Sequence, residues 1–449
     1  MAAEAGETHS NVTADAPMTA FQFVVVMLCC IINVADGADV VAMAYAAPLV
    51  AREWEIRPEV LGMVFGAAPV GMAVGAFLIA PLADRIGRRI VILSSVGAVG
   101  IAMLLTGISD SVPMLAAMRL ATGIGLGALL ASLTVTIVEY TNRRWGNFFI
   151  AVLHIGFAVG ASLMGLVAAA LADDYGWRSF FLFGAAMNGA IFLVGLFVLP
   201  ESAEFLLEAQ PRRALERINR IFARIGRAPL DRLPPRKAKV KSGQGVLSLL
   251  DPPFRRPTLL LWAASIGYAV VSYYHLNWTP HVLTDAGVAT DVAISSGFFT
   301  GTGAIAGNLS MGVLSGRTEP RRLTALYFAG SALSLAAFGL SAPNIYAMFA
   351  FATLISFFTL GGFSGLMIVT SRQYPALVRS TGVGGVVGFG RFGAVIGPVL
   401  GGLMIGAGIE LWGSYLLFAA FAAIPCVTLL LVRAVRPSAA TPVAVGASG

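Results

Sequence analysis

Two aspartates lie inside an apolar stretch of this sequence, where an ionisable side chain is rarely found without a role. The stretch covers residues 21–50, long enough to cross a bilayer as a helix. Asn33, Asp36 and Asp39 recur at every third position, so they share one side of that helix. An ionised Asp at mid-membrane costs about 2.5 to 3.5 kcal/mol, and such residues usually line ion or substrate pathways. We therefore predict that Asp36 and Asp39 carry protons. The alternative is two protonated acids hydrogen-bonded between packed helices.

Three basic side chains fall within other apolar stretches. Arg391 lies roughly 16 Å into its stretch, near mid-membrane, so we predict that it binds an anionic group of a substrate; the alternative is a counter-ion to a buried Asp. Aligning Gly156 with Gly393 places His154 on Arg391, and a histidine that changes charge between pH 5 and 8 suits proton coupling. A plain hydrogen bond between helices is its alternative. Arg119 is predicted to promote proton release from Asp36 or Asp39, unless it only binds backbone carbonyls.

Polar and aromatic residues also gather near the end of the segment 256–283. Their side chains could stack on an aromatic ring and bind its hydroxyl groups. The candidates for substrate binding are Tyr273, Tyr274, His275, Asn277 and Trp278, with Asn308 from the next segment. For Trp278 and His281, anchoring at the membrane interface is the alternative.

The composition requires a membrane around these residues. Hydrophobic residues make up 57% of the chain and charged residues 12%, which excludes a water-soluble surface. The net charge of +7 comes from short basic clusters between apolar runs, so it predicts topology and not nucleic-acid binding. Cys29, Cys30 and Cys426 lie within apolar runs and indicate no disulfide framework. The string Gly388-Phe-Gly390-Arg-Phe-Gly393 follows no strand and a P-loop is absent, so we expect neither a cofactor nor an enzyme.

Twelve apolar segments are each near the length that a spanning helix needs. We predict an all-α membrane protein with twelve transmembrane helices in two six-helix halves, 20–200 and 256–434. The segments are 20–50, 60–82, 90–110, 112–140, 147–172, 177–200, 256–283, 292–315, 322–341, 344–373, 380–406 and 410–434. Of the 30 Lys and Arg residues, only Arg52, Arg57 and Arg178 fall in the predicted outer loops. Both tails, 1–19 and 435–449, are therefore predicted to be cytoplasmic, without a cleaved signal peptide.

The linker between the halves, residues 201–255, is predicted to contain one amphipathic basic helix. Its apolar positions follow the i, i+3, i+4, i+7 spacing, and its arginines take another face. The apolar set is Ala214, Leu215, Ile218, Ile221, Phe222 and Ile225, and the basic set is Arg213, Arg217, Arg220, Arg224 and Arg227. Docking at the lipid interface and a solvated helix without lipid contact are equally compatible with this pattern.

The two halves repeat each other. Gly156-x-x-x-Gly160 matches Gly393-x-x-x-Gly397, in the same alignment that places His154 on Arg391, and this match predicts pseudo-symmetry. Parallel six-span repeats with a central binding site are a known transporter architecture, although close helix packing alone would explain the glycines.

Two motifs make the sequence resemble the major facilitator superfamily. The loop Leu82-Ala-Asp84-Arg85-Ile-Gly87-Arg88-Arg89 is similar to that superfamily's Gly-x-Leu-x-Asp-Arg-x-Gly-Arg-Arg, and Arg119-x-x-x-Gly123-x-Gly125-x-Gly127 is similar to its fourth span. Ala80 replaces the loop's first glycine, and Gly316 stands where the second-half loop would carry an acid. The resemblance covers about residues 20–436 and implies the major facilitator fold. Its gating residues would be Asp84, Arg85, Arg88, Glu139 and Arg144; Asp84 is either a latch or the cap of a turn.

Within that superfamily, Asp36-Gly37-Ala38-Asp39 resembles the Asp-Gly-x-Asp signature of the aromatic acid:proton symporters. Asn277-Trp278-Thr279-Pro280 and Gly390-Arg391-Phe392-Gly393 are also similar to that family. The resemblance implies import of a hydroxybenzoate, protocatechuate or gentisate type of acid with protons, by a monomer in the bacterial inner membrane. The alternatives are proton-coupled efflux of hydrophobic compounds and a transporter-derived sensor of aromatic acids.

Overall fold

The computed structural model describes residues 17–142, 145–234, 249–252, 254–342, 344–374 and 376–432. Residues 1–16 of the predicted N-terminal tail and the whole predicted C-terminal tail, 435–449, lie outside the described residues. Part of the linker lies outside them as well. Twelve long helices form the described body. They are α2 (Ala20–Glu53), α3 (Pro58–Val74), α5 (Arg88–Gly107), α6 (Val112–Tyr140), α7 (Gly146–Tyr175), α8 (Arg178–Val198), α11 (Arg255–Asp285), α12 (Thr290–Leu314), α13 (Pro320–Ser341), α14 (Ile345–Gln373), α15 (Ala376–Gly406) and α16 (Leu411–Leu431).

Short helices connect the long ones. A π-helix, Gly75–Ile79, and a 3-10 turn, Ala80–Leu82, continue α3 toward α4 (Ala83–Ile86). The linker forms α9 (Ala203–Ala209) and α10 (Ala214–Arg224). Among the described residues, eleven helices are long and apolar enough to cross a membrane. The remaining long helix, α12, has 25 residues but is richer in Gly, Ser and Thr, and it packs between α14 and α7. The predicted all-α, twelve-helix fold is thereby confirmed for this part of the chain.

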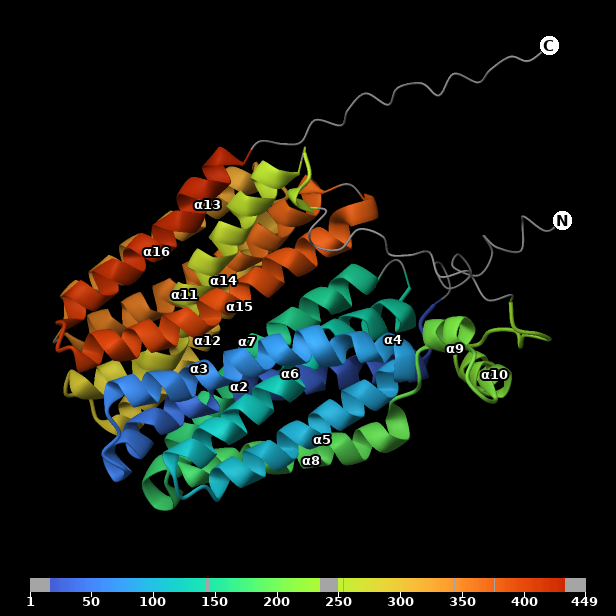
Figure 1. Cartoon of the computed structure of the whole chain (residues 1–449), viewed down its shortest axis with the longest axis horizontal. Coiled ribbons are helices and arrows are strands. Elements are labelled where there is room, and N and C mark those ends of the chain that lie inside the picture. The colour runs from blue at the N-terminus through green and yellow to red at the C-terminus, as the bar shows by residue number, and fades with distance from the viewer. Residues whose placement is uncertain are drawn as a thin grey trace, which may run out of the picture.

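The two halves pack by the same scheme (Figure 1). In the first half α2 packs on α7, α3 on α6, and α5 on α8; in the second half α11 packs on α15, α12 on α14, and α13 on α16. Two seams join the halves, α3 with α15 and α7 with α12, and α2 lies against α11 between them. The second half therefore repeats the helix contacts of the first.

Glycines bring the paired helices close enough for backbone contact. A Cβ atom on Gly160 of α7 would overlap the carbonyl oxygen of Val34 on α2. A Cβ atom on Gly397 of α15 would overlap the carbonyl oxygen of Val270 on α11 in the same way. The glycines that align between the two halves of the sequence thus perform the same packing task in each half.

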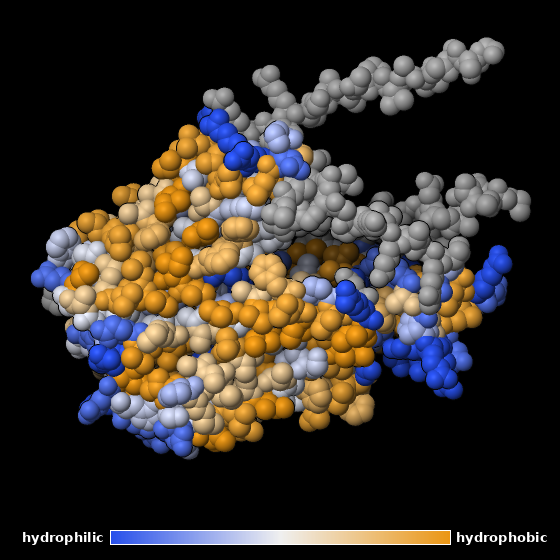
Figure 2. All heavy atoms as spheres, in the orientation of Figure 1, coloured by the Kyte–Doolittle hydropathy of each residue, from blue (hydrophilic) through white to orange (hydrophobic). Residues whose placement is uncertain are grey.

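The halves touch at one end of the bundle and spread at the other. We call the end beside α9 and α10 the linker end and the opposite end the closed end (Figure 1). At the closed end, a Cβ atom on Gly402 of α15 would overlap the carbonyl oxygen of Pro58 at the start of α3, and Gly165 of α7 lies against Gly297 of α12. Figure 2 shows a hollow between the halves on the side of the linker end, within an otherwise apolar surface.

The amphipathic helix of the linker packs on protein with its apolar face. Ile218, Ile221 and Phe222 of α10 are buried, and the guanidinium of Arg224 lies 5.1 Å from the ring centroid of Phe21 at the start of α2. Because the described protein itself covers the apolar face, burial of that face does not require lipid.

The backbone contact at Gly160 predicts that Gly160→Ala lowers the stability of the fold. The added methyl group forces α2 and α7 apart, and overpacking of this kind costs about 2 kcal/mol. Gly189→Ala on α8 is the matched control, since a Cβ atom there meets no atom within 4 Å. Thermal unfolding of the purified protein should show a lower melting temperature for the first variant only. Equal melting temperatures would contradict the contact.

Candidate functional site

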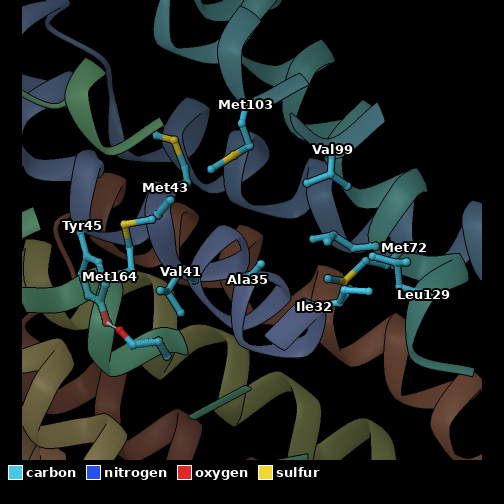
Figure 3. Close-up of a cluster of buried hydrophobic side chains, with 14 of the residues drawn as sticks. Ile32, Ala35, Val41, Met43, Tyr45, Met72, Val99, Met103, Leu129 and Met164 are labelled. Atoms are coloured by element: carbon cyan, nitrogen blue, oxygen red, sulfur yellow. Dashed lines mark hydrogen bonds between the residues drawn. The ribbon is translucent and has the colours of Figure 1, made fainter. Parts of the chain in front are cut away.

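The aspartates of α2 are buried in the middle of the first half. Asp39 is 0% exposed and Asp36 is 7% exposed. Figure 3 shows buried apolar side chains of the same half, among them Ile32 and Ala35 of α2 and Met103 of α5. Oδ1 of each carboxyl group has no hydrogen-bond partner among the described residues. Asn33, on the same side of the helix, donates from its amide to the carbonyl oxygen of Leu153 and so fixes α2 against α7. The acids are therefore held in place, and each keeps an unused oxygen.

Asp39 is bound within the first half. Its Oδ2 accepts a hydrogen bond of 2.7 Å from the amide of Asn188 on α8. A side chain on Gly184, one turn earlier on α8, would lie 3.0 Å from Asp39 Oδ1. Glycine at that position thus makes room for the carboxyl group beside α8.

Arg119 of α6 lies beside Asp39 and acts on it electrostatically. One guanidinium nitrogen lies 3.4 Å from the backbone oxygen of Asp39, and the other contacts the hydroxyl groups of Thr106 and Thr122 at 3.3 and 3.1 Å. The guanidinium also lies 4.9 Å from the ring centroid of Phe181. Arg119 is 2% exposed, so its charge is fixed in position inside the first half.

Arg391 of α15 reaches the boundary between the halves. Its guanidinium donates to the hydroxyl oxygen of Tyr273 on α11 at 3.1 Å and lies 3.1 Å from the sulfur of Met72 on α3. It is half-buried. A cation of the second half thus contacts a helix of the first half.

The other predicted substrate residues on α11 have partners other than Arg391. His275 contacts the carbonyl oxygen of Ala352 on α14 at 3.1 Å, and Trp278 donates to the carbonyl oxygen of Pro398 at 3.0 Å. The ring of Tyr274 stacks on Phe418 with centroids 3.5 Å apart. Asn277 donates to the carbonyl oxygen of Tyr273, one turn back on its own helix. The structure therefore brings only Tyr273 of this set to Arg391.

Two further predicted residues lie at the second seam. His154 of α7 is exposed, and its Nδ1 contacts the carbonyl oxygen of Ile150 at 2.8 Å. Asn308 of α12 is half-buried, and its Oδ1 accepts a hydrogen bond of 2.6 Å from the hydroxyl of Ser364 on α14. Among the described residues, neither His154 nor Asn308 contacts the guanidinium group of Arg119 or of Arg391.

A polar cluster lies at the linker end of the first half and joins its helices to the linker. Arg88 pairs with Glu139, and Ser202 donates to Glu139 at 2.9 Å, which connects the start of α5 and the end of α6 to α9. The carboxylate of Glu201 accepts from the backbone N–H of Arg89 at 3.0 Å. Gly87 has φ +106°, and a side chain there would overlap Glu201. The cluster thus depends on a glycine at this turn.

The remaining gating predictions have different outcomes. Arg85 is exposed, whereas the side chain of Asp84 and all of Arg144 lie outside the described residues. In the second-half loop, where Gly316 lacks an acid, Glu319 forms ion pairs with Arg321 and Arg322 at 2.9 and 2.8 Å. The acid of this loop therefore lies three residues beyond the position that the motif predicts.

Sequence reasoning missed two residues of the site, Asn188 and Met72. Asn188 is one neutral amide in an apolar segment, and Met72 looks like any core methionine. A signal for Asn188 was present, because a buried amide in a spanning helix must find a hydrogen-bond partner.

Comparison with known proteins identifies the family of this chain. Residues 28–326 match the family model of the Major Facilitator Superfamily. The 4-hydroxybenzoate transporter PcaK of Pseudomonas aeruginosa is 30% identical over 396 residues, which is 87% of this chain and 88% of that protein. The gallate transporter of Pseudomonas putida is 31% identical over 415 residues, 91% of each chain. The inward-open structure of the xylose transporter XylE from E. coli superposes with a TM-score of 0.70 at 14% identity, over 94% of this chain and 98% of that one.

This chain therefore belongs to the major facilitator superfamily, a class of multi-pass membrane transporters. Within it, the chain falls among the relatives of the aromatic acid transporters, as the Asp36-Gly37-Ala38-Asp39 motif predicts.

The contact between Asp39 and Asn188 predicts energetic coupling between these residues. Asp39→Ala, Asn188→Ala and the double variant form a mutant cycle, and we expect a coupling free energy of about 2 kcal/mol because a charged group loses a buried donor. Unfolding titrations of the purified protein measure it. Ser331→Ala, in the other half, is the control partner and should add independently to Asp39→Ala. Additive effects of Asp39→Ala and Asn188→Ala would refute the pairing.

Proposed function

We propose that this protein is a secondary transporter, not an enzyme, that imports an aromatic acid together with a proton by alternating access. The observation that carries the proposal is the placement of Arg391 at the boundary of the halves, where it contacts Tyr273 of its own half and Met72 of the other. A guanidinium beside a phenol is suited to bind a carboxylate. The names of the relatives support an aromatic acid as the substrate.

The open linker end is the cytoplasmic end in this proposal. The basic residues of the predicted inner loops, among them Arg88, Arg89, Arg321 and Arg322, gather there, as the positive-inside rule expects. The contacts at the closed end then make this an inward-open arrangement. The protein would sit in the bacterial inner membrane with both termini in the cytoplasm, as a monomer.

Shared use of Arg391 couples the proton to the substrate. In the empty carrier Arg391 compensates an ionised Asp36, so the cavity carries no unpaired charge from this pair. A bound carboxylate takes over Arg391, and Asp36 then needs a proton to remain buried without a counter-ion. Substrate and proton therefore bind together, and the neutral loaded carrier and the paired empty carrier can both change conformation.

The two acids have different tasks in this scheme. Asp39 interacts with Asn188 and Arg119, which belong to its own half and move with it. In the proposed scheme Asp36 pairs with a cation of the other half, so its surroundings change when the halves move. We therefore assign coupling to Asp36 and assign to Asp39 the positioning of Arg119 and α8.

Uptake into liposomes tests the proposed function. Symport of a monovalent anion with one proton moves no net charge, so a pH difference drives it, and one pH unit supplies about 1.4 kcal/mol, a tenfold gradient. Vesicles that are more alkaline inside should accumulate labelled 4-hydroxybenzoate, and a protonophore should abolish the accumulation. Absence of accumulation, for 4-hydroxybenzoate and for gallate, would overturn the proposal.

Asp36→Asn should separate exchange from accumulation. The amide is uncharged at every pH, so the loaded carrier still changes conformation while proton release no longer accompanies substrate release. We expect exchange of labelled for unlabelled substrate to persist within about threefold, and accumulation driven by the pH difference to be lost. Asp39→Asn should impair exchange and accumulation in equal proportion. Full accumulation by Asp36→Asn would contradict its coupling role.

A further inference from the structure

The seam between α7 and α12 brings His154 and Asn308 to the same level of the bundle. At the closed end Gly165 of α7 lies against Gly297 of α12, and Ser162 and Ala158 of α7 face Gly301. The contacts show that the two helices run antiparallel. Counting eleven residues from Gly165 toward the linker end reaches His154, and eleven residues from Gly297 reach Asn308, about 16 Å along each helix.

The side chain of His154 lies on the helix face that points to the seam. His154, Ala158, Ser162 and Gly165 follow the spacing of one face of α7, and the last three contact α12. At the level of His154 the side chain is exposed, and the glycine contacts between α7 and α12 lie nearer the closed end, at Gly165, Gly297 and Gly301. His154 therefore projects into the space between the halves.

Internal symmetry relates this pair to the carboxylate site. The alignment of Gly160 with Gly397 maps His154 onto Arg391, and the offset that pairs Val34 with Val270 maps Met72 onto Asn308. Arg391 and Met72 are in contact across the α3–α15 seam. Because parallel repeats are related by an axis along the membrane normal, equivalent residues lie at equal depth on opposite sides of the centre. His154 and Asn308 therefore face Arg391 across the cleft.

The hydrogen bonds of the pair define what it can bind. Nδ1 of His154 carries a hydrogen, since its partner is the carbonyl oxygen of Ile150, and in the neutral imidazole Nε2 is then the nitrogen that accepts. Oδ1 of Asn308 accepts from the hydroxyl of Ser364, which leaves the amide nitrogen to donate. The pair thus offers one acceptor and one donor together.

We propose that His154 and Asn308 form a subsite for a ring hydroxyl group, at the end of the substrate opposite its carboxylate. A phenol donates to His154 Nε2 and accepts from the Asn308 amide, whereas a carboxylate cannot donate and an unsubstituted ring does neither. This inference rests on the proposed function, and it narrows the substrate to a hydroxylated aromatic acid. It gives His154 a binding role in place of the proton-coupling role predicted from the sequence.

Calorimetry tests this subsite. The purified protein is titrated with 4-hydroxybenzoate, benzoate and 4-methoxybenzoate, and the three affinities are compared. The wild-type protein should bind 4-hydroxybenzoate about tenfold more tightly than the other two, because the methoxy group cannot donate. His154→Phe and Asn308→Leu should each remove this preference and leave benzoate affinity within about twofold. Benzoate binding by the variants also shows that they are folded.

Two control variants sharpen the test. Thr302→Val, at an exposed position of α12, should keep the preference, and Arg391→Gln should weaken all three acids alike. Variants that retain the tenfold preference, or that weaken benzoate as much as 4-hydroxybenzoate, would overturn the subsite. Failure of the wild-type protein to bind or accumulate any aromatic acid would instead overturn the proposed function.

Discussion

The burial of two carboxyl groups in one spanning helix is the constraint on which the rest of this structure depends. An ionised carboxylate in an apolar interior is strongly unfavourable unless donors and opposite charges compensate it. For Asp39 the first half supplies an amide from α8 and a guanidinium from α6. For Asp36 the cation that we propose as its partner is Arg391, on a helix of the other half. One acid is thus compensated internally, and the other depends on how the halves are arranged.

The packing of the halves allows that arrangement to change. Within each half, glycines let the backbones of α2 and α7, or of α11 and α15, touch directly, and such contacts favour a rigid body. Between the halves, the contacts at the closed end join small residues such as Gly62, Gly165 and Gly402. Contacts between small, smooth surfaces can separate without leaving large cavities or unpaired polar groups. Motion between the halves must therefore break these contacts at the closed end, whereas the contacts within each half can persist.

The sequence predicted the charged part of the site because charges in apolar segments are rare and costly. Asp36, Asp39, Arg119 and Arg391 stand out for that reason alone, and the twelve segments follow from length and hydropathy. The direction in which His275 points was beyond such reasoning, since α11 is in contact with α14, α15, α16 and α2, and only packing decides which contact each side chain meets. Glu319 did not fit the motif because it lies three residues beyond Gly316, the position where the motif has its acid, although it still pairs with Arg321.

The internal repeat shows where symmetry is kept and where it is lost. Gly160 and Gly397 occupy equivalent contacts, because backbone approach tolerates no other side chain. The backbone positions that they touch, Val34 and Val270, are therefore equivalent, and the same offset between α2 and α11 maps Asp36 onto Ser272 and Asp39 onto His275. Equal charges on both halves would repel across the centre and would give the two ends of a substrate identical surroundings. With Asp36 on one half and Arg391 on the other, the proposed pairing makes the halves attract when the cleft is empty. The position equivalent to Arg391 in the first half, His154, then remains available for a different part of the ligand.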